Sequence, residues 1–185
     1  MKRKTTKEIL AESFRELAEK KGVDKITIRE ITENCGFSPA TFYRHFKDKY
    51  NLIVWDFDQR CRRITDRIGS DGYTWSQVLL DGPEMVYGQK EYVKNLLNHT
   101  SGQDSFSKNF AHINISLLTR EILKSPDLKK LNTELEICIK VYSYGIVQIV
   151  CDWISGKIKI SPEHLAVLLE QALPEPLKPY LGKMR

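Results

Sequence analysis

The sequence predicts an all-α protein, with a three-helix N-terminal headpiece followed by a larger C-terminal helical domain. Almost every apolar repeat has the spacing of a helix, and no Asn-Gly or Asp-Gly turn joins two alternating runs. Helix starts with good capping residues follow one another before residue 40. The 185 residues are enough for a small module joined to a larger one.

Capping boxes mark the first two helices. In this motif a Thr and a Glu three residues later each satisfy a free backbone amide. Thr5 and Glu8 begin the first helix, and we expect Gly22 to end it in the left-handed conformation. Thr27 begins the second helix, and Gly36 ends it in the same way. Both helices are short and amphipathic, which is typical of a compact headpiece.

The third and fourth helices also have clear starts. Ser38 is the N-cap of the third, and Pro39 takes its first position, where the missing amide costs nothing. Asp48 can cap a longer fourth helix over about residues 48–68. This helix would connect the headpiece to the rest of the chain.

We expect the headpiece to occupy residues 1–50 and the helical second domain residues 51–185. Gly82-Pro83 should interrupt one helix of this domain, and the prolines of the tail should keep it out of a helix. The helices expected beyond the connecting one cover residues 75–87 (with the interruption), the segment KEYVKNLL, and about residues 106–123, 128–154 and 162–173.

The basic charge of the chain is confined to its first third. Residues 1–70 hold 16 Lys and Arg against 11 Asp and Glu, whereas residues 71–185 hold 13 of each. The whole net charge of +5 therefore lies in the part that contains the headpiece. Such an excess favours contact with a polyanion, although five charges are few enough to arise by chance.

Several classes of protein are disfavoured by the sequence. The four cysteines have neither disulfide-framework nor zinc spacing, and no nucleophile elbow, phosphate-binding loop or dinucleotide fingerprint occurs. The start MKRKTTKEIL has no apolar signal region, and the most apolar window, ICIKVYSYGIVQIVCDWI, is too polar and short to span a bilayer comfortably. We expect a soluble cytoplasmic protein that is not an enzyme and needs no cofactor or metal.

The third helix has two distinct faces when successive residues are placed about 100° apart. Phe42 and Phe46 point the same way, into the headpiece core. Thr41 and Arg44 lie on the opposite, outward side with Ala40. A helix with small residues, hydrogen-bonding groups and an Arg outward is suited to the major groove of DNA.

Further donors flank this outward face. Tyr43 and His45 lie on opposite sides of it, where they could reach the two phosphate walls of the groove. Lys47 and Lys49 stand at the start of the next helix, and Thr27 begins the second. The alternative is a small three-helix core whose exposed residues only keep it soluble.

The segment TIREITENCGFSPATFYRHFKDKYNL resembles the DNA-binding signature of TetR/AcrR-type transcriptional regulators. Thr32 and Cys35 stand where this family usually has Ala, which leaves the fold intact. The matching positions are Thr27, Ile31, Gly36, Ser38, Thr41, Phe42, Tyr43, His45, Phe46, Lys49 and Leu52. The resemblance implies a helix-turn-helix in which Thr27, Tyr43, His45 and Lys49 contact phosphates while Ser38, Pro39, Thr41 and Arg44 face the bases.

The resemblance also implies that the second domain forms a homodimer and holds a small-molecule pocket. The long helix is apolar on nearly every side, as is expected of a helix surrounded by neighbours. A core within one chain is the alternative to a dimer. The expected interface residues are Leu135, Tyr142, Ile149, Trp153, Leu165, Leu168, Leu169 and Ala172. The candidate ligand-binding residues are Tyr87, Phe110, His112, Asn114 and Tyr142.

The tail segment YSYGIVQIVCDWISGKIKISPEHLAVLLEQALPEPLKPYL resembles a branch of small TetR-like proteins from Gram-positive bacteria, some of them labelled dihydroxyacetone kinase operon regulators. We therefore expect a homodimeric repressor that binds a palindromic operator in double-stranded DNA and is released by a small-molecule effector, with no membrane partner. A TetR-like co-regulator that acts mainly through a protein partner is the alternative.

Overall fold

The computed structural model describes residues 3–181, and no strand occurs within them. The all-α prediction is confirmed. The α-helices are α1 (Thr6–Ala18), α2 (Ile28–Asn34), α3 (Pro39–Tyr43), α4 (Lys49–Thr65), α5 (Trp75–Tyr87), α6 (Lys90–His99), α7 (Phe106–Ile122), α8 (Thr133–Ile154), α9 (Pro162–Gln171) and α10 (Lys178–Leu181). The 3₁₀ turns are η1 (Val23–Lys25), η2 (Gly102–Asp104) and η3 (Glu175–Leu177).

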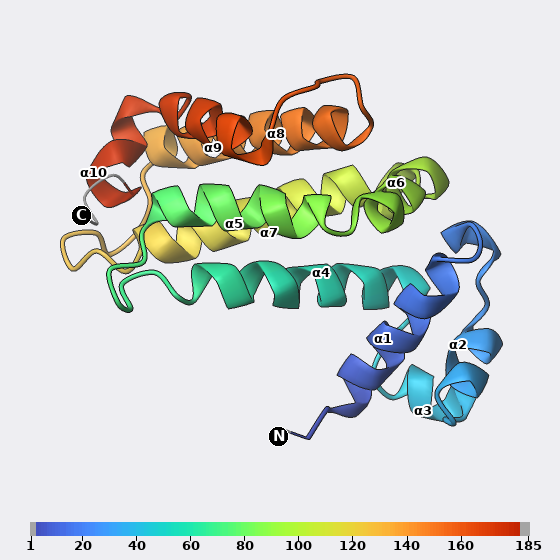
Figure 1. Ribbon diagram of the computed structural model, residues 1–185. Helices are drawn as coiled ribbons and strands as arrows, with labels where there is room; N and C mark the ends of the chain where they lie inside the picture. Colours follow the sequence, from blue (N-terminus) through green and yellow to red (C-terminus); the bar gives the residue numbers. More distant parts are fainter. Residues whose placement is uncertain (1–2, 182–185) are drawn as a thin grey trace.

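The helices form a headpiece and a layered bundle (Figure 1). Helices α1 to α3 make the headpiece at one end, and α4 runs from it along the bundle. Helices α5 and α7 form the middle layer against α4, and α8 and α9 form the outer layer, with α7 packed on α8 and α5 on α9. Helix α4 therefore runs from the headpiece into the bundle, and α6 joins the two parts as well, through the hydrogen bonds of Asn95 with Ala18 and Val23.

The headpiece has its own apolar centre. Leu10, Phe14, Ile31 and Phe42 have no exposed surface. The Ser13 hydroxyl on α1 donates a hydrogen bond to the Ile31 carbonyl on α2 at 2.7 Å, which joins the two helices. Because Phe42 of α3 is buried in this apolar centre, packing against the other headpiece helices sets the orientation of α3.

The capping predictions are confirmed, but the role predicted for Gly22 is wrong. Thr5 and Thr27 form complete capping boxes, and Gly36 has the expected positive φ of 72°. Helix α1 ends earlier, at Ala18, and Gly22 has φ −57°. A Cβ at this position would lie 2.6 Å from the Asp24 carboxylate, which is the end of a side chain that can move aside.

Tertiary packing also changes three other helix predictions. Helix α5 continues through Gly82-Pro83, because the buried Pro83 ring packs into the bundle. Helix α8 begins at Thr133, where the Asn132 side chain accepts a hydrogen bond from the Leu135 amide at 2.8 Å. The tail forms η3 and α10, because burying Leu177 and Leu181 against the bundle outweighs the prolines.

Helix α8 is the one described helix whose length and composition would suffice to cross a bilayer, with a mean hydropathy of 1.4 over its most apolar window. The expectation that this segment is too short is therefore wrong. Half of the window is buried in the subunit, where α8 packs on α7. The other half is exposed.

Candidate functional site

Helix α3 is anchored to the headpiece by two aromatic side chains. Phe42 is fully buried and Phe46 is 3% exposed, with their ring centroids 5.7 Å apart. Ser38 caps the helix by accepting a hydrogen bond from the Thr41 amide at 3.2 Å, and Pro39 takes the first position. Both anchors lie on the side predicted from the helical period, so the opposite face of α3 is directed outward.

The outward face of α3 carries linked polar groups. Arg44 Nη2 donates a hydrogen bond to Thr41 Oγ1 at 3.2 Å, and Thr41 Oγ1 lies 3.1 Å from Ser38 Oγ. Tyr43 is 60% exposed and packs the edge of its ring against Phe42. No predicted DNA-binding residue is fully buried; the set is Thr27, Ser38, Pro39, Thr41, Tyr43, Arg44, His45, Lys47 and Lys49.

Lys49 has a structural role that the sequence did not indicate. Its Nζ donates hydrogen bonds to the carbonyls of Asp24 at 2.7 Å and Ile26 at 2.8 Å. Partial burial lowers the pKa of the Lys49 ammonium below its ordinary value. Lys49 therefore ties the start of α4 to the loop before α2, and an ammonium has one further N–H to offer a phosphate.

Thr27 is exposed at the start of α2, but its side chain is engaged within the headpiece. The hydroxyl donates to the Glu30 carboxylate at 2.9 Å and accepts from the Glu30 amide at 3.2 Å. Hydrogen bonds from Lys21 and from the Thr27 amide and hydroxyl lower the pKa of Glu30 to about 2. The capping box thus fixes the start of α2, and a contact of Thr27 with a phosphate stays a prediction.

An apolar cavity of about 70 Å³ lies inside the bundle. Residues of α4, α5, α7, α8 and α9 line it, and Phe110 and Asn114 are among them as predicted. The sequence did not indicate that α4 contributes Cys61, Ile64 and Thr65. Burial raises the pKa of the Cys61 thiol to about 12, so this group remains protonated and acts as part of the apolar wall.

Three of the predicted ligand-binding residues do not line this cavity. His112 is exposed on the surface of α7. Tyr87 is 48% exposed and stacks on Trp153 with ring centroids 5.1 Å apart. Tyr142 is buried, but its hydroxyl donates to the Leu169 carbonyl at 2.7 Å. The sequence did not show which face of each helix meets the cavity, and a role of these three residues in ligand binding stays a prediction.

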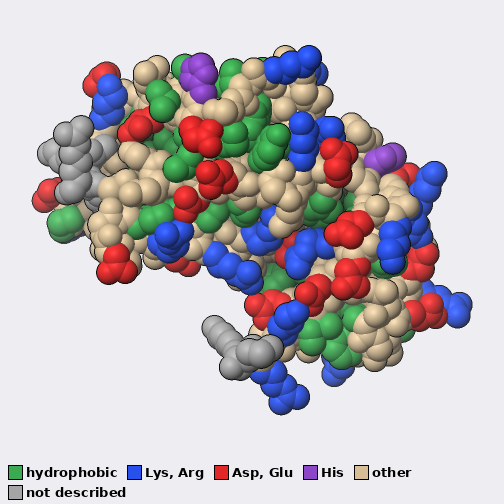
Figure 2. Space-filling view, in the orientation of Figure 1, with side chains coloured by type: hydrophobic (Ala, Val, Ile, Leu, Met, Phe, Trp, Pro, Cys, Tyr) green, Lys and Arg blue, Asp and Glu red, His purple; other side chains and the backbone are tan. Residues whose placement is uncertain are grey.

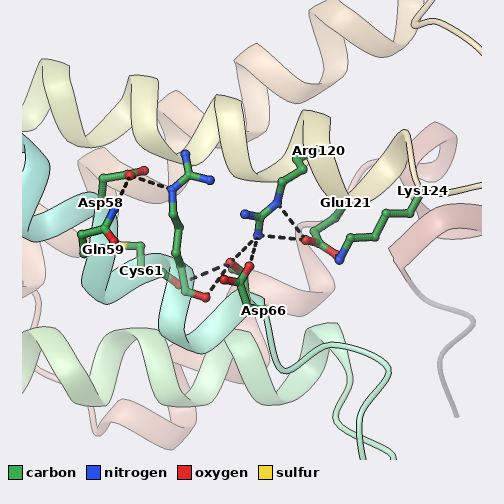
Figure 3. Close-up of polar contacts among 9 residues, drawn as sticks. Asp58, Gln59, Cys61, Asp66, Arg120, Glu121 and Lys124 are labelled. Carbon is green, nitrogen blue, oxygen red and sulfur yellow. Dashed lines mark hydrogen bonds and ion pairs between the residues drawn. The ribbon is translucent and has the colours of Figure 1, made fainter. Parts of the chain in front are cut away.

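The far end of α4 is tied to α7 by a polar cluster (Figure 3). Arg120 Nη2 lies 2.7 Å from Asp66 Oδ1 and donates to Thr65 Oγ1 at 3.0 Å. Glu121, which is 6% exposed, is paired with Arg120 at 3.1 Å and with Lys124 at 2.6 Å. Thr65 belongs both to this cluster and to the cavity wall, so α4 links the cavity to the headpiece.

The outer surface of α8 and α9 exposes large apolar side chains. Of the predicted interface residues, Ile149, Leu168 and Ala172 are exposed. The other five are buried within the subunit: Leu135, Tyr142, Trp153, Leu165 and Leu169. The exposed apolar set, here called the α8–α9 stripe, consists of Ile137, Val141, Tyr144, Ile149, Val167 and Leu168.

Comparison with known proteins assigns both parts of the chain. Residues 9–54 match the family "Bacterial regulatory proteins, tetR family", and residues 73–175 match a "Transcriptional regulator C-terminal region". An uncharacterized HTH-type transcriptional regulator of Haemophilus influenzae is 27% identical over 108 residues, covering 55% of this chain and 53% of that protein. The HTH-type dhaKLM operon transcriptional activator DhaS of Lactococcus lactis is 27% identical over 75 residues, or 40% of each chain. The match thus spans about half or less of these curated relatives.

Solved structures share the fold at low sequence identity. The dihydroxyacetone kinase operon activator DhaS has a TM-score of 0.66 and 18% identity, covering 95% of this chain and 98% of its own. NalD, the secondary repressor of the MexAB-OprM multidrug efflux pump in Pseudomonas aeruginosa, has a TM-score of 0.57 and 17% identity, covering 95% of both chains. With a tetR-type headpiece, a matching regulator C-terminal region over more than half of its length and this fold, the chain belongs to the TetR family of transcriptional regulators.

Proposed function

We propose that this protein is a cytoplasmic homodimeric regulator that binds a palindromic operator through α3 and acts as a repressor released by a small-molecule effector. The observation that carries the proposal is the outward face of α3, where Ser38, Thr41 and Arg44 are linked above two buried Phe anchors. A short helix held this firmly with its polar groups outward is suited to the major groove.

The headpiece residues divide into two roles in this proposal. The Arg44 guanidinium can donate two hydrogen bonds to one guanine, and Thr41 and Ser38 can contact neighbouring bases. Pro39 offers no hydrogen bond and would add only apolar contact. The phosphate contacts, which fix the register on the duplex, would come from Thr27, Tyr43, His45, Lys47 and Lys49.

The α8–α9 stripe is the proposed dimer interface. Val141 is 65% exposed and Val167 is 50% exposed, and a two-fold axis would bring these apolar surfaces of two copies together. A symmetric dimer places two copies of α3 in successive major grooves, about 34 Å apart on one side of the duplex.

An effector in the bundle cavity would act through α4. Cys61, Ile64 and Thr65 of α4 line the cavity, and α4 begins at the headpiece with Lys49. A ligand that binds better when α4 is displaced would favour a spacing of the two headpieces that does not fit the operator. The lining predicts a small, largely apolar effector, with the Asn114 amide as its main polar contact.

Selection of bound DNA from a random pool at near-physiological salt tests the DNA-binding part of this proposal. We expect a palindrome with half-sites about one helical turn apart. Sedimentation of the free protein should give a dimer at micromolar concentration. Recovery of no sequence preference would overturn sequence-specific binding, and a monomer would overturn the two-fold arrangement.

A co-regulator that acts mainly through a protein partner is the second candidate. The cavity of about 70 Å³ is small for an effector site, and the DhaS relatives are named activators. In this case the purified protein alone would not protect the DNA upstream of its own gene from cleavage, whereas a repressor of the proposed kind would.

A further inference from the structure

A second cavity, of about 300 Å³, lies where the headpiece meets the bundle. We call it the junction cavity. Its lining comes from α1, from α4 and from Gln89, which lies between α5 and α6. Figure 2 shows acidic and basic side chains interleaved where the headpiece meets the bundle. The junction cavity is polar and is separate from the apolar cavity described above.

Basic groups other than Arg60 already donate hydrogen bonds to the acidic groups of the junction cavity. Arg15 of α1 donates to Asp56 Oδ1 of α4. The remaining pairs at its rim are Lys4 with Glu12 at 2.6 Å and Arg63 with Glu8 at 3.3 Å. Lys4, Arg15, Arg60 and Arg63 face Glu8, Glu12 and Asp56 in this lining, so the basic groups outnumber the acidic ones by one. Arg15 and Arg60 share the carboxylate of Asp56.

Arg60 is buried without a full set of partners. The residue is 9% exposed, and neither Nη1 nor Nη2 has a hydrogen-bond acceptor within residues 3–181. The Asp56 carboxylate, which Arg15 already holds, lies 3.9 Å from Nη1. Burial lowers the pKa of the Arg60 guanidinium, which reflects the cost of enclosing this charge. A buried cation of this kind is stabilised by a counter-charge that also accepts its hydrogen bonds.

Gln89 adds an unused acceptor to the same cavity. Its Oε1 is buried and receives no hydrogen bond from any residue that the structure describes. The junction cavity therefore combines a buried cationic donor with a neutral acceptor on a different element. A molecule that contacts both groups must carry an oxyanion and an O–H or N–H donor.

We propose that the junction cavity binds a small hydroxycarboxylate, whose carboxylate accepts hydrogen bonds from Arg60 and whose hydroxyl donates to Gln89 Oε1. Water could complete the hydrogen bonds, but it carries no charge, and Arg60 has only the Asp56 carboxylate that Arg15 also holds. The volume is in the range typical of sites for small metabolites. Because the lining joins α1 to α4, the bound anion would also brace the headpiece against the bundle.

Isothermal titration of the full chain with glycolate tests this proposal without DNA, so its outcome is independent of the proposed function. Acetate, which lacks the hydroxyl, and chloride serve as comparison anions at constant ionic strength. We expect one site per chain, with glycolate bound about tenfold more tightly than acetate because only glycolate supplies a donor for Gln89. Equal affinities for the three anions, or no binding of glycolate, would overturn the proposal.

Two variants and a control locate the site. Arg60→Met should weaken glycolate binding by at least about tenfold, because it removes the cation. Gln89→Leu should abolish the preference for glycolate over acetate while acetate still binds, which keeps the test informative if Arg60→Met does not fold. Lys157→Gln removes an exposed charge on the bundle that is paired with Asp152 and lies outside the junction cavity, and it should change affinity less than about threefold. Unchanged binding in both Arg60→Met and Gln89→Leu would place the anion elsewhere.

Discussion

The Arg44 guanidinium donates a hydrogen bond to the Thr41 hydroxyl at 3.2 Å on the outward face of α3. Thr41 in turn lies 3.1 Å from the Ser38 hydroxyl, which caps the helix. The side chain that we propose reads a base is therefore already oriented in the free protein. Such pre-organisation reduces the conformational entropy lost on binding.

Replacing Arg44 tests the base-reading role. Arg44→Ala should lower affinity for the selected operator by about 1–3 kcal/mol while affinity for an unrelated duplex changes much less, because a bidentate base contact is lost. Fluorescence anisotropy with both duplexes measures this. Lys157→Ala removes an exposed charge on the bundle and should leave both affinities unchanged. If Arg44→Ala left the ratio of operator affinity to unrelated-duplex affinity unchanged, the base-reading role of Arg44 would be refuted.

Lys49 and Lys47 form a pair that separates stability from DNA contact. Lys49→Ala should lower the free energy of unfolding by about 1–2 kcal/mol, since two carbonyl hydrogen bonds are lost, and should weaken specific and nonspecific DNA binding about equally. Lys47 is exposed, so Lys47→Ala should weaken DNA binding with little change in stability. Urea unfolding and anisotropy measure the two effects. Equal losses of stability in both variants would contradict a stabilising role of the Lys49 hydrogen bonds to the Asp24 and Ile26 carbonyls.

The α8–α9 stripe can be tested by adding one charge. Val141→Glu places a carboxylate at a 65% exposed position of α8, and we expect a folded monomer because burying an unpaired charge in the interface is costly. Leu123→Glu, at a 39% exposed position at the end of α7 and off the stripe, should remain a dimer. Sedimentation velocity distinguishes them. A dimeric Val141→Glu would exclude this interface.

A substitution at Gly82 can test the role of the bundle cavity, because this residue lines it. A Cβ at this position would meet no atom within 4 Å, and the residue lies inside α5 and lines the cavity. Gly82→Ala should raise the free energy of unfolding by about 0.5–1 kcal/mol because Ala favours helix, and should weaken effector binding. Gly72→Ala should have the opposite effect on stability, since Gly72 has φ +74°. Thermal unfolding measures both.

The acid stability of the headpiece should depend on Glu30. Its pKa is about 2 in the folded protein against an ordinary value of 4.5, so its carboxylate stabilises the folded state fully above about pH 4.5. This contribution is lost as the pH falls from about 4.5 toward 2, because the unfolded chain binds the proton over this range while the folded protein does not. Glu30→Gln should therefore lose less stability than the parent protein over this range in urea titrations at successive pH values. If the free energies of unfolding of Glu30→Gln and the parent protein fell in parallel with pH, Glu30 would not be the group responsible for the loss of stability in acid.

The sequence alone determined the local features of the headpiece. The capping boxes at Thr5 and Thr27, the Ser38-Pro39 start and the inward side of Phe42 were all predicted from residues within one or two turns. These features depend on neighbours in the chain, which is why they can be predicted without knowing the fold. The resemblance to TetR-type regulators rests on the same local pattern.

Only the tertiary structure decided how the apolar and charged surfaces are used. Helix α8 is apolar on several faces, and packing within the subunit buries Tyr142, whose hydroxyl bonds Leu169 of α9, while it leaves Val141 exposed. The Lys49 ammonium donates hydrogen bonds to carbonyls about two dozen residues away in the chain. The Arg60 guanidinium is buried, and neither its Nη1 nor its Nη2 atom has a hydrogen-bond partner among the described residues. These outcomes depend on contacts between segments far apart in the sequence, which hydrophobic period and local spacing do not encode.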